Sequence, residues 1–296
     1  TNCLTLRLLH AAKGYKAVAF DIFDTLLKRD CARPADLFAL MEVTHQAALG
    51  FAEARVAAEA ETRQTLGREV TLAEIYAHPA LRGTDPAAEC AAELAMIAPN
   101  RPVAQAAAAC HARGQKVYAV SDMYLPKTQI EAMLQKCGLD FLDGVFVSCE
   151  YGVQKRSGKL FKLFLQQTAL RPAEVLFVGD NPRADFAGAA LAGIRCFLLP
   201  QPTPLPYTKT PADAVGGVTA ATLQNCCQNL SPSAALGAEL LGPLAVGFAT
   251  WLHGQRAAIP GAKLVFLARD MYLVRQVYQL LYPEEETFYL KVSRQS

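Results

Sequence analysis

Short apolar runs rich in Val and Phe recur along the chain up to residue 200. They span Ala17 to Phe20, Val117 to Val120, Val145 to Val147, Val175 to Val178 and Cys196 to Leu199. Each run is too short for a helix and is typical of a buried strand. Helical patterns lie between them, opened by Pro and closed by Gly at 102–114 and again at 126–138. Strands that alternate with helices predict an α/β fold with a doubly wound parallel sheet.

The first two expected strands are separated by more chain than one crossover helix needs. The intervening residues, about 28–100, are rich in Ala, Glu and Arg and show no strand signal. They indicate several amphipathic helices, broken at Gly67, Pro79, Pro86 and Pro99. We expect an inserted helical cap over the carboxyl edge of the sheet, where ligands bind in such folds. An insertion that does not touch the site is the alternative.

The composition changes after Leu199, where the chain reads PQPTPLPYTKTP. Because a stretch rich in Pro and Thr holds regular structure poorly, we place a domain boundary there, with a core domain over 1–200 and a smaller α/β region over 201–296. The second region is expected to contain helices over 213–230 and 234–257, a strand at 264–268, a helix through Tyr282 and a strand near 288–292. The chain begins with Thr and stops just after this last strand, which leaves open a longer natural protein.

Charge and cysteine content narrow the class of partner. The chain has 29 basic and 27 acidic residues, so it lacks the basic stripe of a nucleic-acid binder and a small partner is expected. Its nine cysteines are odd in number and have no metal-ligand spacing, which favours reduced thiols in the cytoplasm.

The most apolar stretch runs from Ala234 to Trp251 and is interrupted by Glu239 and Pro243. It is shorter than an unbroken bilayer span, so the sequence predicts a buried helix and no membrane span. The N-terminal residues also lack the pattern of a secretory signal, which agrees with a cytoplasmic protein.

Four polar residues follow the expected strands: Asp21, Ser121, Lys155 and Asp180. The carboxyl ends of parallel strands meet at one edge, so these side chains should converge in one crevice. A carboxylate can attack a phosphoryl centre and form a covalent intermediate. A second carboxylate can hold Mg²⁺ against the first, while a lysine and a hydroxyl neutralise the charge of the transferred group. The set therefore predicts a magnesium-dependent hydrolase.

In these residues the chain resembles the haloacid dehalogenase (HAD) superfamily of hydrolases, over about residues 16–200. The family's first motif matches FDIFDTLL, which implies Asp21 as nucleophile and metal ligand and the backbone oxygen of Phe23 as a further ligand. The second motif matches VSDMY, which implies Ser121, with Asp122 beside it, as the binding site of the transferred phosphate. The resemblance also implies a Rossmann-like core, a helical cap and Mg²⁺ as the cofactor.

The other two motifs of this family are also present. GVQKRSGKLF implies Lys155 as the catalytic, phosphate-binding lysine, since it fits the family position better than Lys159. FVGDNPRAD implies Asp180 as a metal ligand and Asp185 as an indirect helper in that acidic cluster. Taken alone, Ser121 would be a helix N-cap, Asp185 a first-turn carboxylate and Lys155 a surface charge, so their joint order along the chain carries the interpretation.

One residue departs from the pattern of the family's phosphatases. These enzymes usually carry a second Asp, two residues after the nucleophile, as general acid and base; here that position is Phe23, and an acid follows one residue later at Asp24. Successive strand residues face opposite sides, so the sequence does not show that Asp24 can replace the missing acid. Without an acid, the loss would be roughly 100- to 10,000-fold in rate.

Three functional hypotheses follow. The first is a Mg²⁺-dependent phosphohydrolase of a small phosphorylated metabolite or sugar phosphate. The second is a weakly catalytic binding module, since a FDIFDTLL domain with a downstream FLARD strand resembles bacterial proteins that accompany glycosyltransferases in surface-polysaccharide synthesis. The third is a dehalogenase, which would not need the metal.

Two similar stretches occur in the two regions of the chain: VYAVSDMYL at 117–125 and VFLARDMYL at 265–273. Both place an Asp just past an expected strand. A single pair is compatible with duplication or with coincidental reuse of a strand-to-helix turn. For Arg269 and Asp270 we expect a capped helix start.

Overall fold

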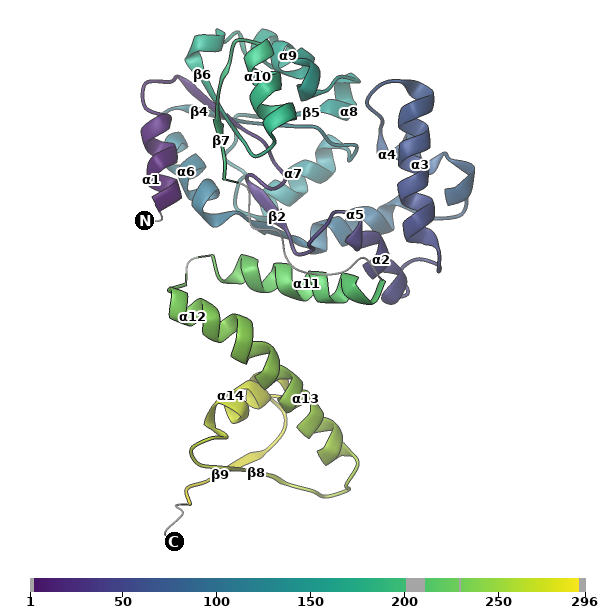
Figure 1. Cartoon of the computed structure of the whole chain (residues 1–296), viewed down its shortest axis with the longest axis vertical. Coiled ribbons are helices and arrows are strands. Elements are labelled where there is room, and N and C mark those ends of the chain that lie inside the picture. Colours follow the sequence, from purple (N-terminus) through teal and green to yellow (C-terminus); the bar gives the residue numbers. More distant parts are fainter. Residues whose placement is uncertain (1–2, 201–210, 229, 293–296) are drawn as a thin grey trace. The chain divides into compact units, whose positions relative to one another are not determined.

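A computed structural model describes residues 3–200, 211–228 and 230–292 of the 296-residue chain. The described residues divide into two compact units, one up to residue 228 and one from residue 230. The first unit contains the five-stranded sheet and the candidate site (Figure 1).

The sheet of the first unit is parallel throughout, with the strand order β5-β4-β1-β6-β7. Its strands are β1 (Ala17–Phe20), β4 (Lys116–Ser121), β5 (Gly144–Val147), β6 (Val175–Gly179) and β7 (Arg195–Leu198). These are the five apolar runs of the sequence, so the predicted strands and the predicted α/β class are confirmed. In the register, Phe20 of β1 lies beside Ala119 of β4 and Val178 of β6. The carboxyl ends of these three central strands therefore meet.

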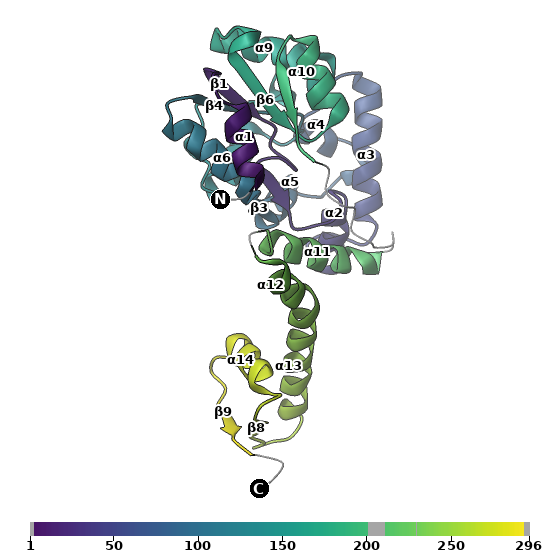
Figure 2. The ribbon, with the colours of Figure 1, turned by 60° about the vertical axis from the view of Figure 1, so that its left-hand side comes forward.

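The two faces of the sheet pack into separate cores, because successive strand residues point to opposite sides. In β1, Val18 and Phe20 join one buried cluster while Ala17 and Ala19 join the other. On the first face lie α1 (Cys3–Ala11), α6 (Arg101–Ala112) and α7 (Lys127–Lys136), with α1 beside α6 (Figure 2). On the second face lie α9 (Lys159–Thr168) and α10 (Gly188–Leu191). The sheet is thus covered by helices on both sides, as a doubly wound fold requires.

Short helical turns lie in the connections between the strands. They are α8 (Ser148–Tyr151), η2 (Lys155–Ser157), η3 (Pro172–Glu174) and the π-helical turn η4 (Pro182–Ala187). Two of these, η2 and η4, carry residues of the candidate site.

A helical insertion separates β1 from β4, as the sequence predicts. It contains α2 (Asp36–Val43), α3 (Phe51–Leu66), α4 (Leu72–Tyr76), η1 (Pro79–Leu81) and α5 (Pro86–Ala95). The expectation that it has no strand is wrong, since β2 (Leu27–Arg29) and β3 (Ile97–Pro99) pair antiparallel where the chain leaves and re-enters the core. Both strands have only three residues and mixed polarity, so no alternating pattern in the sequence predicts them.

The first unit extends past the expected boundary at residue 200. Helix α11 (Pro211–Cys226) packs against α2 and belongs to this unit. Near its end, Asn225 Nδ2 donates hydrogen bonds to Arg29 O at 3.0 Å and to Asp30 Oδ1 at 2.8 Å. The structure thus divides the chain near residue 229. Most of the Pro-rich stretch that suggested the boundary, residues 201–210, lies outside the described residues.

The second unit contains helices packed beside two parallel strands. Its elements are α12 (Pro232–Leu236), η5 (Gly237–Leu241), α13 (Gly242–Ala257), β8 (Leu264–Leu267), α14 (Tyr272–Leu281) and β9 (Thr287–Leu290). They agree with the elements expected from the sequence. The core of this unit is small, and Ala249, Phe266 and Tyr278 are its buried members.

The helix formed by the long apolar stretch 234–251 is largely exposed, and the expectation that it is buried is wrong. Only Ala245 and Ala249 of α13 are buried, while Leu244 is 66% and Trp251 is 55% exposed. The helix continues through both expected interruptions: Glu239 lies in the π-helical turn η5, and Pro243 follows that turn within the helix that spans residues 232–257. Residues 232–257 are long and apolar enough to cross a membrane, although length and composition alone do not distinguish a span from other helices.

Candidate active site

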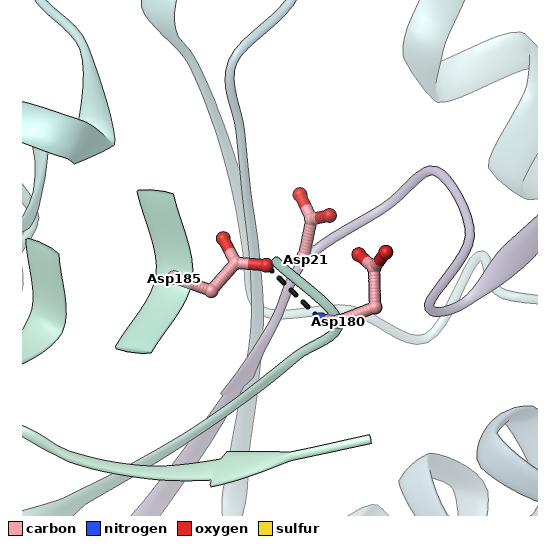
Figure 3. A group of neighbouring side chains, drawn as sticks. All are labelled: Asp21, Asp180 and Asp185. Atoms are coloured by element: carbon pink, nitrogen blue, oxygen red, sulfur yellow. Dashed lines mark hydrogen bonds between the residues drawn. The ribbon is translucent and has the colours of Figure 1, made fainter. Parts of the chain in front are cut away.

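Three carboxylates meet at the carboxyl edge of the sheet. Asp21 directly follows β1, and its backbone N–H donates to Val178 O of β6 at 2.8 Å. Asp180 directly follows β6, and Asp185 lies in η4. Each residue places one carboxylate oxygen within 4.8 Å of those of the other two, and Figure 3 shows the three side chains facing a common point. The sequence-predicted convergence of Asp21, Asp180 and Asp185 is thus present in the structure.

A buried lysine joins this cluster. Lys155 begins η2 and is 2% exposed. Its Nζ lies 2.6 Å from Asp21 Oδ1 and 2.6 Å from Asp185 Oδ1, so one ammonium group bridges two carboxylates. Its position depends on Gly188, because a Cβ at that residue would overlap the Lys155 carbonyl oxygen. Lys159, the alternative in the sequence, is exposed.

Asp185 organises the loop that carries Asp180. Asp185 Oδ2 accepts hydrogen bonds from the backbone N–H groups of Asp180 at 3.0 Å, drawn as the dashed line in Figure 3, and of Asn181 at 2.9 Å. Gly179 permits this approach, since a Cβ there would collide with the Asp185 carboxylate. Asp185 Oδ1 lies 2.6 Å from Lys155 Nζ, on the side of the other carboxylates. One oxygen thus fixes the loop while the other faces the cluster.

Burial and mutual repulsion shift the protonation of these carboxyls. Burial raises the pKa of Asp21 to about 7, against the lowering effect of Lys155, and the charge of Asp185 adds to the rise. Burial also raises the pKa of Asp180, helped by Asp24 and Asp185. Burial alone would lower the pKa of Lys155, but Asp21 and Asp185 outweigh it and raise the pKa, so the lysine stays charged.

The donor set suits a hard divalent cation. Mg²⁺ prefers oxygen ligands, and one or two carboxylates are its usual protein ligands. Here three buried or half-buried carboxylates face a single ammonium, that of Lys155, which lies 2.6 Å from Asp21 Oδ1 and from Asp185 Oδ1. This excess of buried negative charge is what a divalent cation offsets. The residues present therefore fit a metal ion at this edge.

The remaining predicted residues flank the cluster. Ser121 ends β4, the neighbour of β1, and is 2% exposed. Asp122 follows it and accepts the backbone N–H of Lys155 on Oδ1 at 2.8 Å, which ties the second strand end to the lysine. Burial raises the pKa of Asp122, while Lys155 lowers it. The role of the Phe23 backbone oxygen as a metal ligand stays a prediction.

Asp24 is not one of the three clustered carboxylates, but it is close enough for its charge to raise the pKa of Asp180. Its backbone adopts a left-handed conformation with φ of 60°, its side chain is 54% exposed, and its nearest described cation is Lys28 Nζ at 3.6 Å. The neighbouring Phe23 lines a cavity of about 530 Å³ together with Asp122 and residues of α2 and α3, including Phe38. The helical insertion therefore contributes to the cavity beside the strand ends, and the alternative of an uninvolved insertion is less consistent with this geometry.

Sequence reasoning missed a residue pair that lies against Phe23. The Arg29 guanidinium carbon stands 3.9 Å from the centre of the Phe23 ring, and Glu93 accepts two hydrogen bonds from Arg29. Arg29 and Glu93 lie 64 residues apart in the chain, and neither belongs to a motif. Without homologous sequences that covary, no pattern in one chain would have joined them.

Comparison with known proteins gives the family. The family model for haloacid dehalogenase-like hydrolases matches residues 15–193. A phosphoserine phosphatase of Thermus thermophilus is 43% identical over 51 residues, which are 17% of this chain and only 20% of that protein. A HAD family enzyme of Bacteroides thetaiotaomicron is 16% identical with a TM-score of 0.47, covering 63% of this chain and 94% of that structure.

A further solved structure is the L-2-haloacid dehalogenase of Xanthobacter autotrophicus with chloropropionic acid covalently bound. It is 23% identical, with a TM-score of 0.44, over 62% of this chain and 76% of that structure. The family match covers more than half of the chain and contains all four motifs and the residues that meet at the sheet edge. The chain belongs to the haloacid dehalogenase-like hydrolase family.

Proposed function

We propose that this hydrolase is a Mg²⁺-dependent phosphohydrolase of a small phosphorylated metabolite or sugar phosphate, and that it acts through an aspartyl-phosphate on Asp21. The observation that carries the proposal is the position of Asp21 between Lys155 and the carboxylates of Asp180 and Asp185. A buried carboxylate beside a fixed cation can attack a phosphoryl group while the cation neutralises the oxygens of that group. The matched stretch of a phosphoserine phosphatase supports the same chemistry.

Each residue of the site has a role in this proposal. An Asp21 oxygen attacks phosphorus, and the Lys155 ammonium and the Ser121 hydroxyl bind the phosphoryl oxygens. Asp122 positions Lys155 by accepting its backbone N–H. Asp21, Asp180 and the Phe23 carbonyl would hold Mg²⁺, with Asp185 fixing the loop, and the bound ion would supply further charge neutralisation.

The helical insertion acts as a cap in this proposal. Its α2 and α3 supply one wall of the 530 Å³ cavity, and the core supplies the other. A cavity of this volume is within the usual range for small-molecule sites. We place the enzyme in the cytoplasm, in keeping with its free cysteines. The comparisons give no support to an association with glycosyltransferases, and we do not include it.

A substrate panel with matched variants tests the proposal. Wild-type protein should release phosphate from at least one class of phosphoester in Mg²⁺ and lose this activity in EDTA. Asp21→Asn should abolish it, and Asp270→Asn, which changes an exposed Asp in the second unit, should not. Halide release from 2-haloacids without metal would instead establish a dehalogenase. No release of either product across the panel would contradict the proposal.

A further inference from the structure

We infer that the site is specific for phosphoesters and acyl phosphates whose leaving group is a weakly basic oxyanion on an apolar, ring-sized body. The inference rests on the proposed function and deepens it. Its basis is the cavity beside the strand ends. This cavity is lined by the phenyl ring of Phe23, which follows the nucleophile Asp21 by two residues in the chain. A phenyl ring binds an apolar group but cannot donate a proton to a leaving group.

The Phe23 ring is held in place by a buried ion pair. The Arg29 guanidinium stacks on it at 3.9 Å, and Arg29 Nε and Nη2 donate to the two oxygens of Glu93 at 3.0 and 3.2 Å. The Arg29 side chain is 10% exposed and that of Glu93 is 1% exposed. A two-pronged pair with little access to water has a fixed geometry. The ring is therefore a permanent part of the cavity wall.

Another part of the cavity wall repeats this construction. Phe38 and Tyr124 line it, and the Arg55 guanidinium lies 4.8 Å and 4.7 Å from the centres of their rings. Arg55 is fully buried and donates to both oxygens of Glu89, at 2.6 and 2.8 Å. Two arginine–glutamate pairs thus support aromatic side chains that line the cavity. Such side chains favour an apolar, planar group.

Two acidic side chains compete with this interpretation as proton donors. Glu59 is not one of them, because it accepts hydrogen bonds from Arg55 and Arg63 and serves as their counter-ion. Asp122 lines the cavity and uses one oxygen to accept the Lys155 N–H, which leaves its second oxygen. Asp24 is half-exposed beside Lys28, and its charge acts on Asp180 of the cluster. The experiment must therefore include Asp122 and Asp24.

The reaction needs no proton on the leaving group when that group is weakly basic. An Asp21 oxygen forms a bond to phosphorus as the bond from phosphorus to the leaving oxygen breaks, and the bonding pair departs with that oxygen as an aryloxide or carboxylate anion. Water then attacks phosphorus, the bond to Asp21 breaks, and the electron pair returns to the carboxylate. The proton of the water passes to bulk solvent. Neither step uses a further reactant.

This scheme has a kinetic consequence. Formation of the phosphoenzyme determines kcat/KM and should depend steeply on the basicity of the leaving group, since no acid assists its departure. Hydrolysis of the phosphoenzyme has no general base at Phe23 and should limit kcat for the best substrates. The rapid release of one equivalent of leaving group, followed by slower turnover, is the expected signature.

The experiment measures kcat/KM in Mg²⁺ for substituted phenyl phosphates of graded leaving-group basicity, for benzoyl phosphate, and for an alkyl phosphate of similar size. We expect the alkyl ester to be roughly 100- to 10,000-fold slower than the best aryl ester, which is the usual contribution of a general acid. Phe23→Asp should flatten the dependence and raise alkyl turnover, while Phe23→Leu should keep the dependence steep. Benzoyl phosphate distinguishes acyl from aryl preference.

The outcomes separate the two proposals. Equal rates for aryl and alkyl esters in the wild type would overturn the inference and leave the phosphohydrolase intact. A dependence that becomes steeper in Asp122→Asn or in Asp24→Asn would show that the replaced carboxyl donates the proton, which also overturns it. Absence of turnover and of phosphoenzyme for every ester would contradict the proposed function itself. If Phe23→Asp fails to fold, the dependence of wild-type kcat/KM on leaving-group basicity still tests the inference.

Discussion

Two stretches of this chain are similar in sequence but differ in their structural surroundings. Residues 117–125 read VYAVSDMYL and residues 265–273 read VFLARDMYL. Each contains a strand followed by an Asp. The first stretch ends beside the candidate active site, whereas in the second Arg269 and Asp270 are exposed and have no side-chain hydrogen bond or ion pair in the described part of the chain. Neither caps α14, so the expected capped helix start is also absent.

The difference lies in the neighbours of each strand. β4 pairs with β1 and β5 in a sheet covered on both faces, so Asp122 meets the backbone of Lys155 and the lysine meets Asp21. Within the described residues β8 pairs only with β9, and most of its side chains are partly or largely exposed. A strand-to-helix turn with an Asp thus becomes a site only where adjacent strands end in complementary groups.

The largest effect should come from replacing Lys155, the buried cation beside the first strand end. Lys155→Met would leave buried Asp21 and Asp185 without their shared partner, and breaking a buried pair costs about 3–5 kcal/mol. Urea unfolding in EDTA measures this loss, and Mg²⁺ should restore part of it. Lys159→Met is the matched control, with a change within about 0.5 kcal/mol because the residue is exposed. Equal effects of the two variants would contradict the assigned role of Lys155.

A smaller effect should distinguish glycines in the two regions. Gly179→Ala would push a methyl group into the Asp185 carboxylate, and overpacking of this kind costs about 1–3 kcal/mol. Gly247→Ala in α13 meets open space and should stabilise the helix by about 0.5–1 kcal/mol. Thermal unfolding of both variants measures the contrast, and Mg²⁺ titration of Gly179→Ala should show weakened binding. Unchanged binding would mean that Asp185 does not organise the metal loop.

Features that depend on local sequence could be predicted, whereas features that depend on tertiary packing could not. The five core strands and most helices follow from apolar runs and from Pro and Gly punctuation, because those signals are local. The four motif residues could be placed at one edge because parallel topology fixes where strand ends meet. The close approach of Gly188 to Lys155 depends on packing between distant segments.

Other features were outside the reach of sequence patterns for the same reason. The Phe23–Arg29–Glu93 stack joins side chains through tertiary contact alone. Helix α11 was assigned to the second region because the composition changes near residue 200, but Asn225 bonds it to the backbone at Arg29 and to Asp30. The exposure of α13 could not be predicted either, because its apolar residues indicate burial whether or not a partner element exists.

The smallest effect is the pH dependence of Mg²⁺ binding, which should depend on Asp21 at the first strand end and not on Asp270 at the second. Because burial raises the pKa of Asp21 to about 7, from 3.8 in the unfolded chain, the native metal-free protein retains a proton that the unfolded chain loses. The resulting stabilisation is complete below pH 3.8 and is lost as the pH rises towards 7. Mg²⁺ competes with this proton, so its affinity should rise on the order of tenfold between pH 6 and 8.

Calorimetric titration with Mg²⁺ at several pH values measures this dependence. Asp270→Asn should leave the profile unchanged, since Asp270 is exposed and distant in sequence from the cluster. Asp21→Asn should remove both the dependence and most of the binding. An affinity that does not vary with pH would show that Asp21 is already ionised at pH 6.

The central claim is that the sheet edge at the end of β4, with Asp21 and Lys155, is a catalytic site and that the end of β8, with Asp270, is not. Trapping of a phosphoenzyme tests this claim most directly. The wild type and Asp270→Asn should each form an acid-stable, hydroxylamine-sensitive phosphoenzyme from an aryl phosphate in Mg²⁺, and peptide mapping should find the phosphate on Asp21. Asp21→Asn should form none. Phosphate on another residue, or equal labelling of Asp21→Asn, would contradict the account.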